Sequence, residues 1–322
     1  VNRYNTYARD YGENKLYRIG AGPRNENYHW TEELMKHSGL FLDAIALHYY
    51  TRIGDKVVMV HDVDGNERYL RNEENSRGSA TDFKEDAWFG MMKSTLHTDT
   101  IVKKHSAIMD KYDPEKRVAL IVDEWGTWFD CEPGTNPGFL YQQNTMRDAL
   151  VAGLSLNIFN KHCDRVKMAC IAQMVNVLQS VILTEGEKMI LTPTYHVFHQ
   201  YRHHQDADLV ESCITGNSTL DAGEKEYQVP KLQESVSIDK DGIVTITLNN
   251  LSATDSEEVE VAFTELNPSD VSASIVNQEM HAYNTFEEPE NVTEEAFTAY
   301  EITEKGLRFT IPACSVVAFR VK

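Results

Sequence analysis

A nearly unbroken apolar run at residues 117–125 (RVALIVDEW) is the feature that most constrains the fold. A run without polar alternation is typical of a strand covered on both faces, as in a parallel sheet flanked by helices. The run turns acidic at its end, at Asp123 and Glu124. Burying a carboxylate is costly unless a partner compensates it, so a buried strand end keeps one mainly when the group is used or well paired.

The region around this run alternates short apolar stretches with helical patterns. Strands are predicted at 15–21, 43–50, 117–125 and 167–175, and helices at 2–11, 31–36, 81–110, 139–162 and 194–203. The helix at 31–36 is expected to begin with Thr31 as its cap, and 51–80 is predicted to be a polar insertion. A helix followed by four strand–helix units is half of a (β/α)₈ barrel, which needs about 250 residues. An open doubly wound sheet is the alternative, but no Gly-rich phosphate turn follows any of the strands.

From about residue 205 the pattern changes to strict alternation, which indicates half-buried antiparallel strands. Asp241-Gly242 and Lys305-Gly306 are predicted to be hairpin turns that use a residue with positive φ. The pattern predicts an antiparallel β-sandwich of roughly jelly-roll type. The expected domains are a partial (β/α)₈ barrel (strands 5–8) at 1–195 and the sandwich at 196–322.

Composition excludes some classes of partner. The net charge is -19, and an acidic surface repels phosphate backbones, which argues against nucleic acid. No apolar run is long enough to span a bilayer, so no membrane partner is expected. The five cysteines are irregularly spaced without a CxxC pair, which predicts reduced, mostly buried thiols. The chain opens on Val1, so its location stays open between cytoplasmic, periplasmic and secreted.

Polar residues end the predicted strands, where barrel enzymes carry their chemistry. These are His48 and Tyr50, then Glu124, then Gln173. Glu124 is the candidate nucleophile, because a retaining glycosidase needs a carboxylate that attacks the anomeric carbon. Strand alternation predicts that Asp123 and Glu124 point to opposite sides. The alternative is that both carboxylates only cap a strand end beside an arginine.

Aromatic and histidine side chains give weaker signals. Trp128 is a candidate for stacking on a sugar ring, whereas Trp125 is expected in the core. His196, His199 and His203 have helical spacing that can build a metal site. No carboxylate or cysteine stands beside them, so a solvated or packed helix face is favoured and no metal is expected.

Several separate motifs match one known family in the right order. The segments are NKLYRIGAGP, LHYYT, LIVDEWGTWFD, GFLYQQNTMRDALVAGLSLNIFNKHCDRVKMACIAQMVNVLQSVILTEG and TPTYHVF. They resemble family 51 of the glycoside hydrolases, which consists chiefly of α-L-arabinofuranosidases. The resemblance covers the chain up to the start of the sandwich. It implies a (β/α)₈ barrel with a jelly-roll-like sandwich, and a retaining mechanism that uses two glutamates and no cofactor.

The resemblance also implies roles for single residues. Glu124 matches the nucleophile at the end of the seventh barrel strand, and His48 and Tyr50 match the His-x-Tyr pair after the sixth. His48 would support the nucleophile or the sugar, and Tyr50 would bond the nucleophile. Gln173 matches the glutamine that ends the eighth strand and bonds sugar hydroxyls, and Trp128 matches an aromatic residue lining the pocket. The implied reaction releases terminal α-L-arabinofuranose from arabinan or arabinoxylan.

The chain departs from the family where the acid/base glutamate is expected. That glutamate lies in a Gly-Asn-Glu motif after the fourth strand, and the chain begins after this point. Asn25-Glu26 matches only the Asn-Glu pair in letters and follows the fifth-strand segment, so it is interpreted as a surface decoy. We expect the chain alone to be inactive and to associate with a missing N-terminal half of the barrel or with another copy of itself. The complete protein is expected to be a homo-oligomer.

Two other functions stay open at this point. One is another retaining barrel glycosidase, such as an endoglucanase or a xylosidase, because these share the nucleophile strand. The other is a non-catalytic carbohydrate-binding fragment in which the sandwich binds the sugar. The strand faces of the predicted sandwich carry no row of aromatic residues, which disfavours that second reading.

Overall fold

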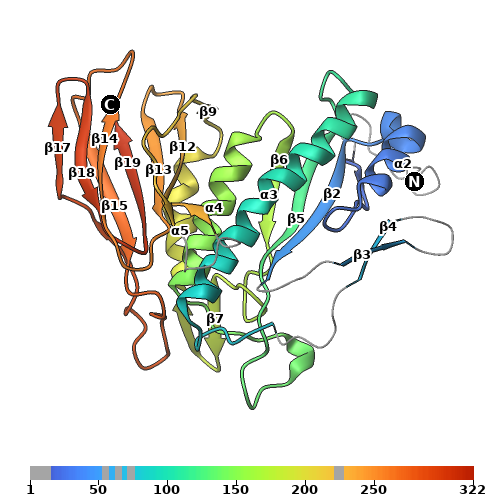
Figure 1. The fold of residues 1–322 in the computed structure, drawn as a ribbon, viewed down its shortest axis with the longest axis horizontal. Helices are drawn as coiled ribbons and strands as arrows, with labels where there is room; N and C mark the ends of the chain where they lie inside the picture. The colour runs from blue at the N-terminus through green and yellow to red at the C-terminus, as the bar shows by residue number, and fades with distance from the viewer. Residues whose placement is uncertain (1–15, 53–57, 62–66, 71–76, 221–227) are drawn as a thin grey trace.

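The computed structural model describes residues 16–52, 58–61, 67–70, 77–220 and 228–322. Four layers follow one another across the molecule: a three-stranded sheet, a six-stranded sheet, a layer of helices and a four-stranded parallel sheet (Figure 1). Within these ranges, no helix is both long and apolar enough to cross a membrane. The helix predicted at 2–11 lies outside the described residues.

The parallel sheet confirms the predicted strand–helix units. Its order is β1-β2-β5-β6, and each strand is parallel to its neighbour. The strands are β1 (Ile19–Gly20), β2 (Ala44–Thr51), β5 (Ala119–Thr127) and β6 (Val166–Ile171), and the helices are α2 (Tyr28–Ser38), α3 (Glu85–Tyr112), α4 (Met146–Lys161) and α5 (Pro193–Tyr201). Spatial order equals chain order, as in successive strands of a barrel.

Three helices begin elsewhere than predicted, and one of them is α3, which begins at Glu85 rather than at residue 81. Asn27, not Thr31, caps α2, because the Asn27 side chain accepts a hydrogen bond from the Trp30 N–H at 3.2 Å. α4 begins after Thr145 rather than at 139, because Thr145 and Asp148 form a capping box. Before it, the 3₁₀ turn η2 (Pro137–Phe139) ends at a residue with φ of 53°, which is incompatible with a continuous helix.

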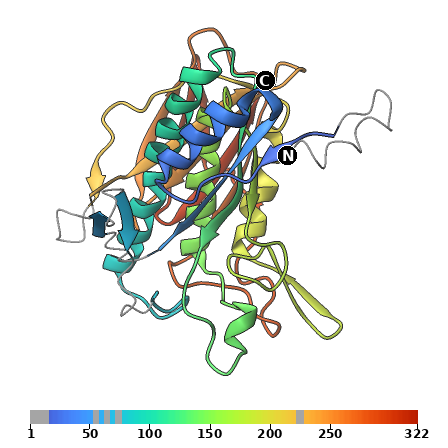
Figure 2. The ribbon, with the colours of Figure 1, turned by 90° about the vertical axis from the view of Figure 1, so that its right-hand side faces the viewer.

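Two hairpins were not predicted. β3 (Val58–His61) pairs with β4 (Glu67–Leu70) inside the insertion, and β7 (Ile182–Glu185) pairs with β8 (Lys188–Leu191) between β6 and α5. Figure 2 shows β7–β8 and η2 at the lower end of the molecule, where β5 leaves the sheet. This end is therefore lined by loops that follow the strands.

The C-terminal region is the predicted β-sandwich. Its larger sheet has the order β16-β15-β19-β13-β12-β9, and its smaller sheet has the order β14-β18-β17. The strands are β9 (Asp208–Leu209), β12 (Leu232–Ile238), β13 (Val244–Asn250), β14 (Glu257–Ala262), β15 (Val271–Asn277), β16 (Glu294–Ala296), β17 (Tyr300–Thr303), β18 (Gly306–Ile311) and β19 (Ser315–Val321); a short pair, β10 (Thr219–Leu220) and β11 (Val229–Pro230), lies apart. Apolar side chains of both sheets fill one core between them.

Both predicted hairpin turns are present, but only one of them uses a glycine with positive φ. Gly242 has a φ of 76°, as a hairpin turn requires. Gly306 instead lies at the start of β18, and a Cβ there would stand 1.7 Å from the Val261 carbonyl oxygen. Gly306 is therefore needed for close approach of two backbones, not for a positive φ.

A polar layer joins helix α4 to the sandwich. Thr247 Oγ1 donates to Asn157 Oδ1 at 2.6 Å, and Asn157 Nδ2 donates to Gln233 Oε1 at 2.7 Å. His204, in the 3₁₀ turn η3 (Arg202–His204) after α5, contacts Ser237 Oγ at 2.8 Å and Thr247 Oγ1 at 3.0 Å. The predicted division between residues 195 and 196 falls inside α5 and stays a prediction.

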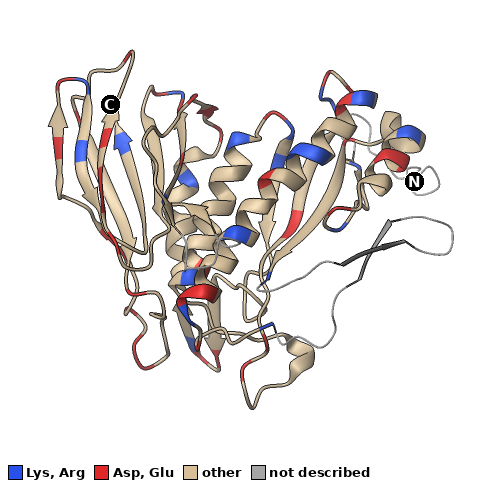
Figure 3. Ribbon diagram, in the orientation of Figure 1, with Lys and Arg blue, Asp and Glu red and all other residues tan. Residues whose placement is uncertain are grey.

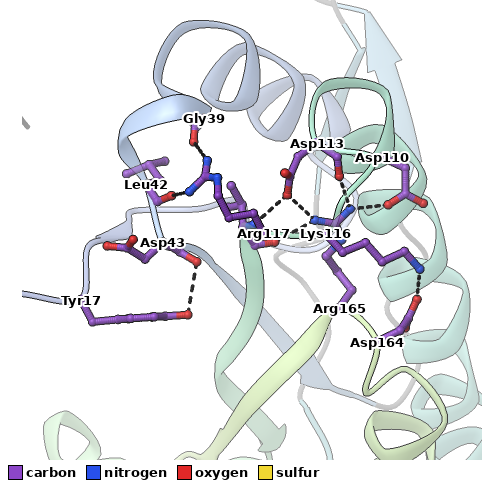
Figure 4. Close-up of polar contacts among 11 residues, drawn as sticks. Tyr17, Gly39, Leu42, Asp43, Asp110, Asp113, Lys116, Arg117, Asp164 and Arg165 are labelled. Carbon is purple, nitrogen blue, oxygen red and sulfur yellow. Dashed lines mark hydrogen bonds and ion pairs between the residues drawn. The ribbon is translucent and has the colours of Figure 1, made fainter.

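The amino ends of the strands are held by buried arginine contacts (Figure 4). The fully buried Arg165 donates to Asp113 Oδ2 at 2.9 Å and to the Val118 carbonyl at 2.8 Å. Burial opposes ionisation of Asp113, but the Val118 N–H and Arg165 outweigh it and hold the pKa of Asp113 below its usual value. Groups at this end of a barrel serve stability rather than chemistry.

The predictions about the cysteines are confirmed in part, and the charged residues are mixed along the helices. Lys and Arg are interspersed with Asp and Glu along the helices that the structure describes (Figure 3). All five cysteines are free, as predicted. Only Cys314 is buried, whereas Cys170 and Cys213 are exposed, so the expectation of mostly buried thiols was wrong.

Candidate active site

One extra residue in β5 shapes the candidate site. On β2 the pairing advances by two residues, from Ala46 to His48, while on β5 it advances by three, from Ile121 to Glu124. The same shift recurs on the β6 side. Such a bulge breaks the alternation of side chains. The predicted opposite orientation of Asp123 and Glu124 is therefore wrong, because both carboxylates reach the same histidine, His48.

Glu124 is held through one of its two carboxylate oxygens. The Tyr50 hydroxyl donates to Oε2 at 3.0 Å, and His48 Nδ1 lies 3.1 Å from the same oxygen. Burial, and then the Glu124 carboxylate, raises the pKa of Tyr50 well above its ordinary value, so the phenol stays protonated as a donor. Glu124 Oε1 has no hydrogen bond or ion pair within the described ranges, which leaves it as the oxygen able to attack an electrophilic carbon.

His48 is fixed through its backbone by the segment that follows β1. Its N–H donates to the Pro23 carbonyl at 3.2 Å, and its own carbonyl accepts from the Asn25 N–H at 2.9 Å. Arg24 forms a parallel bridge with His48, is exposed, and is close enough for its charge to act on Tyr50. Arg24 was not among the predicted site residues, although its place three residues after a predicted strand was a usable signal.

Gln173 lies where it was predicted to lie. It is exposed and follows β6, the strand next to β5, and its backbone N–H donates to the Val177 carbonyl at 3.1 Å. The preceding residue, Ala172, donates its N–H to the Trp125 carbonyl at 2.8 Å, which places Gln173 beside the end of β5, the strand that carries Glu124. Its contact with sugar hydroxyls stays a prediction.

Trp128 lies beside Tyr50, the residue that donates a hydrogen bond to Glu124. Its ring meets Tyr50 edge-on, with centroids 4.9 Å apart. The guanidinium groups of Arg52 and Arg77 lie over the ring, at 4.3 and 4.5 Å from its centroid. These two arginines stand at the ends of the insertion, and no feature of the sequence pointed to them. Trp125, in contrast, packs in the core at 2% exposure, as predicted.

A buried polar network anchors β5 just beyond Glu124. Gln179 Oε1 accepts from the Thr127 N–H at 2.9 Å, and the Thr127 hydroxyl donates to Asp148 Oδ1. A Cβ at Gly126, where φ is 136°, would stand 3.1 Å from Gln179 Oε1. Gly126 therefore lets the Gln179 amide approach the strand. The Asp148 carboxylate joins helix α4 to the strand that carries Glu124.

The Asn25-Glu26 pair is half-buried rather than fully at the surface, as it was predicted to be. The Glu26 side chain is 16% exposed and lies 2.8 Å from His97 Nε2. Burial alone would raise the pKa of Glu26, but His97 outweighs it and holds that pKa below its usual value. A carboxylate kept ionised in this way is poorly suited to act as a general acid.

The histidines of α5 do not build a metal site with their neighbours. His199 Nδ1 contacts Glu294 Oε2 of the sandwich. Among the residues that the structure describes, no group of three or more His, Cys, Asp or Glu side chains is placed to hold a metal ion.

Comparisons with known proteins identify relatives over the whole chain. Residues 123–315 match the family described as alpha-L-arabinofuranosidase C-terminal domain. An intracellular exo-alpha-L-arabinofuranosidase of Bacteroides ovatus is 40% identical over 321 residues, which cover 99% of this chain and 59% of that protein.

Solved structures agree with this match. The GH51 arabinofuranosidase from Xanthomonas axonopodis pv. citri is 42% identical, with a TM-score of 0.90 over 100% of this chain and 61% of that one. A family 51 alpha-L-arabinofuranosidase from Bifidobacterium longum shares the fold, with a TM-score of 0.76 at 20% identity over 98% of this chain and 61% of that one. The chain thus spans about 60% of the length of these relatives.

Proposed function

Because the chain belongs to the alpha-L-arabinofuranosidase C-terminal domain family, within glycoside hydrolase family 51, we propose that it carries the nucleophile of a retaining α-L-arabinofuranosidase. Glu124 Oε1 attacks the anomeric carbon of a terminal arabinofuranosyl unit, and water then hydrolyses the glycosyl-enzyme intermediate. The substrate is an arabinan- or arabinoxylan-type oligo- or polysaccharide. No cofactor takes part in the proposed mechanism.

One observation carries the proposal. The Tyr50 hydroxyl and His48 both hold Glu124 Oε2, so the carboxylate is oriented with its other oxygen unoccupied. Orientation of a nucleophile before the substrate arrives lowers the entropic part of the barrier. Gln173 on the next strand supplies hydrogen bonds to sugar hydroxyls, and Trp128 lines the pocket beside Tyr50.

The proposed site is completed by further polypeptide, because a retaining enzyme needs a second carboxyl group as acid and base. The sheet has β1 and β6 as its edges. Both edges carry exposed apolar side chains, with Ile19 on β1 at 47% exposure and Met168 on β6 at 50%. Open edges of this kind favour pairing with another strand. We therefore propose that this chain acts with the remaining barrel strands of the family, and that the complete protein is a homo-oligomer.

The test is hydrolysis of p-nitrophenyl α-L-arabinofuranoside. This chain is assayed alone, and again after co-expression with the part of the Bacteroides ovatus relative that it does not cover. Turnover is expected only from the combination. Glu124→Ala should abolish it, and azide should partly rescue Glu124→Ala by replacing the missing nucleophile.

Other outcomes have definite meanings. Cleavage of aryl xylosides or cello-oligosaccharides, with the arabinofuranoside left intact, would overturn the arabinose assignment. The retaining mechanism would still stand. Full turnover by Glu124→Ala would overturn the role of Glu124. Sugar binding without any cleavage, retained when residues 1–195 are deleted, would favour a carbohydrate-binding role for the sandwich.

A further inference from the structure

We propose that Asp123 is a positioning residue that acts on Glu124 through His48. The inference deepens the proposed function and rests on it. Its starting point is the bulge in β5, which turns two consecutive carboxylates toward one imidazole ring.

The ring of His48 joins the two carboxylates through its two nitrogens. Nε2 lies 3.2 Å from Asp123 Oδ1, and Nδ1 lies 3.1 Å from Glu124 Oε2. Asp123 Oδ1 is buried and makes no well-aligned hydrogen bond in the described part of the chain. His48 is therefore the polar partner that the described part of the chain gives this oxygen.

The chemistry of imidazole explains what Asp123 does. Which ring nitrogen carries a proton, and which way the ring faces, are set by the group that contacts the other nitrogen. Asp123 holds the Nε2 side of the ring and prevents the ring from turning over, so that Nδ1 stays directed at Glu124 Oε2. A carboxylate that orients a catalytic histidine in this way is a recurring device.

Asp123 is not placed to be the missing acid. In a retaining glycosidase the acid and the nucleophile flank the scissile bond, with carboxyl groups about 5 to 5.5 Å apart. Asp123 and Glu124 come from consecutive residues of one strand and contact one ring, so they stand on the same side of any sugar bound there. The geometry therefore assigns Asp123 to support of the nucleophile.

The experiment is a double-mutant cycle in the complete enzyme assembled from this chain and the remaining barrel strands. The variants are Asp123→Asn, His48→Gln and both together, and the measurements are kcat and KM. Asp99→Asn is the matched control. Asp99 also lies against a histidine, 2.7 Å from His162 Nε2, and is equally exposed at 36%, but it is on α3.

Asp123→Asn should lower kcat about 10- to 100-fold, as loss of a group that orients a ligand or catalytic side chain does. KM should stay within about twofold, because a residue that acts through His48 makes no contact with the sugar. The double variant should be no slower than His48→Gln, because Asp123 acts only through that ring. Additive losses, an unchanged kcat, or a rise in KM alone would each overturn the proposal. Asp99→Asn should retain wild-type kcat.

A second measurement separates this inference from the proposed function. In the isolated chain, the ring ¹⁵N resonance of His48 Nε2 should move in Asp123→Asn and stay in place in Asp99→Asn. An unmoved resonance would contradict the Asp123–His48 contact even if the enzyme is active. A moved resonance in a protein that cleaves no arabinofuranoside would instead reject the proposed function and leave the contact standing.

Discussion

Tyr50 on β2 and Glu124 on β5 are 74 residues apart in sequence, yet the phenol donates to the carboxylate at 3.0 Å. Two adjacent parallel strands that end at the same edge bring them together. The phenol is held in its donor form by burial and by the carboxylate it serves. The fold of the two strands is therefore enough to form the pair.

Tyr50→Phe removes that donor and keeps the ring that packs against Trp128. A hydrogen bond to a charged group contributes about 1.5 to 3 kcal/mol, which corresponds to roughly 10- to 150-fold in rate. We expect kcat of the complete enzyme to fall by this amount. Steady-state kinetics on the aryl arabinofuranoside measures it, and an unchanged kcat would show that the bond does not serve the reaction.

Thr127→Val tests the network behind the nucleophile strand. The change keeps the shape of the side chain but removes a donor from the fully buried Asp148 carboxylate. Leaving a buried acceptor short of a partner costs about 1 to 3 kcal/mol. Urea unfolding of the chain should show this loss. Thr310→Val, at an exposed position of β18, should change the free energy of unfolding by less than about 0.5 kcal/mol.

His204 should make the fold sensitive to acid. Burial, with the charges of His203 and Arg320, lowers the pKa of His204 to about 4. In the unfolded chain a histidine has a pKa of about 6.5. Between these values the unfolded state binds a proton that the folded state excludes, so the free energy of unfolding falls as pH drops from about 6.5 to 4.

His204→Gln should flatten that dependence in urea titrations. Because the pKa of His203 is also lowered to about 4, some slope should remain. Wild type and variant should show parallel behaviour between pH 7 and 8, where neither state takes up the proton. An equal slope in both proteins below pH 6.5 would show that His204 is not the group responsible.

Met168→Asp tests the open edge of the parallel sheet. A charge on the exposed face of β6 should weaken association with the remaining barrel strands or with a second copy of the chain. Sedimentation velocity should show a larger fraction of monomer. Ile302→Asp replaces a similarly exposed residue, at 46%, on β17 of the sandwich and should leave association unchanged. Equal behaviour of the two variants would locate the contact elsewhere.

The sequence predicted the strands of the sheet because long apolar runs have few alternatives. The run that became β5 was placed to within two residues at each end. The hairpin β7–β8 was missed because four-residue strands carry too little periodicity to be recognised. The start of α4 was misplaced because the apolar pattern continues back through η2, where the backbone geometry interrupts the helix.

The strand ends predicted where the candidate side chains lie but not their geometry, and the roles of these residues stay predictions. The candidate side chains all lie at the carboxyl ends of the parallel strands, which meet on one side of the sheet. They are His48, Tyr50, Glu124 and Gln173. Asp123 was assigned to the wrong side because alternation is assumed until a bulge is seen, and a bulge needs the register of both neighbours. The Thr127–Asp148 contact depends on how α4 docks, which no local pattern encodes.

Helix α4 is enclosed on two sides, by the strand that carries Glu124 and by the sandwich sheet. The helix therefore belongs to the packing of both parts of the molecule. A gene rearrangement that moves the sandwich to another barrel would have to move a matching helix with it. Calorimetry should record one unfolding transition, whereas two separable domains would give two. The sandwich therefore helps to determine the shape of the half that carries the candidate site.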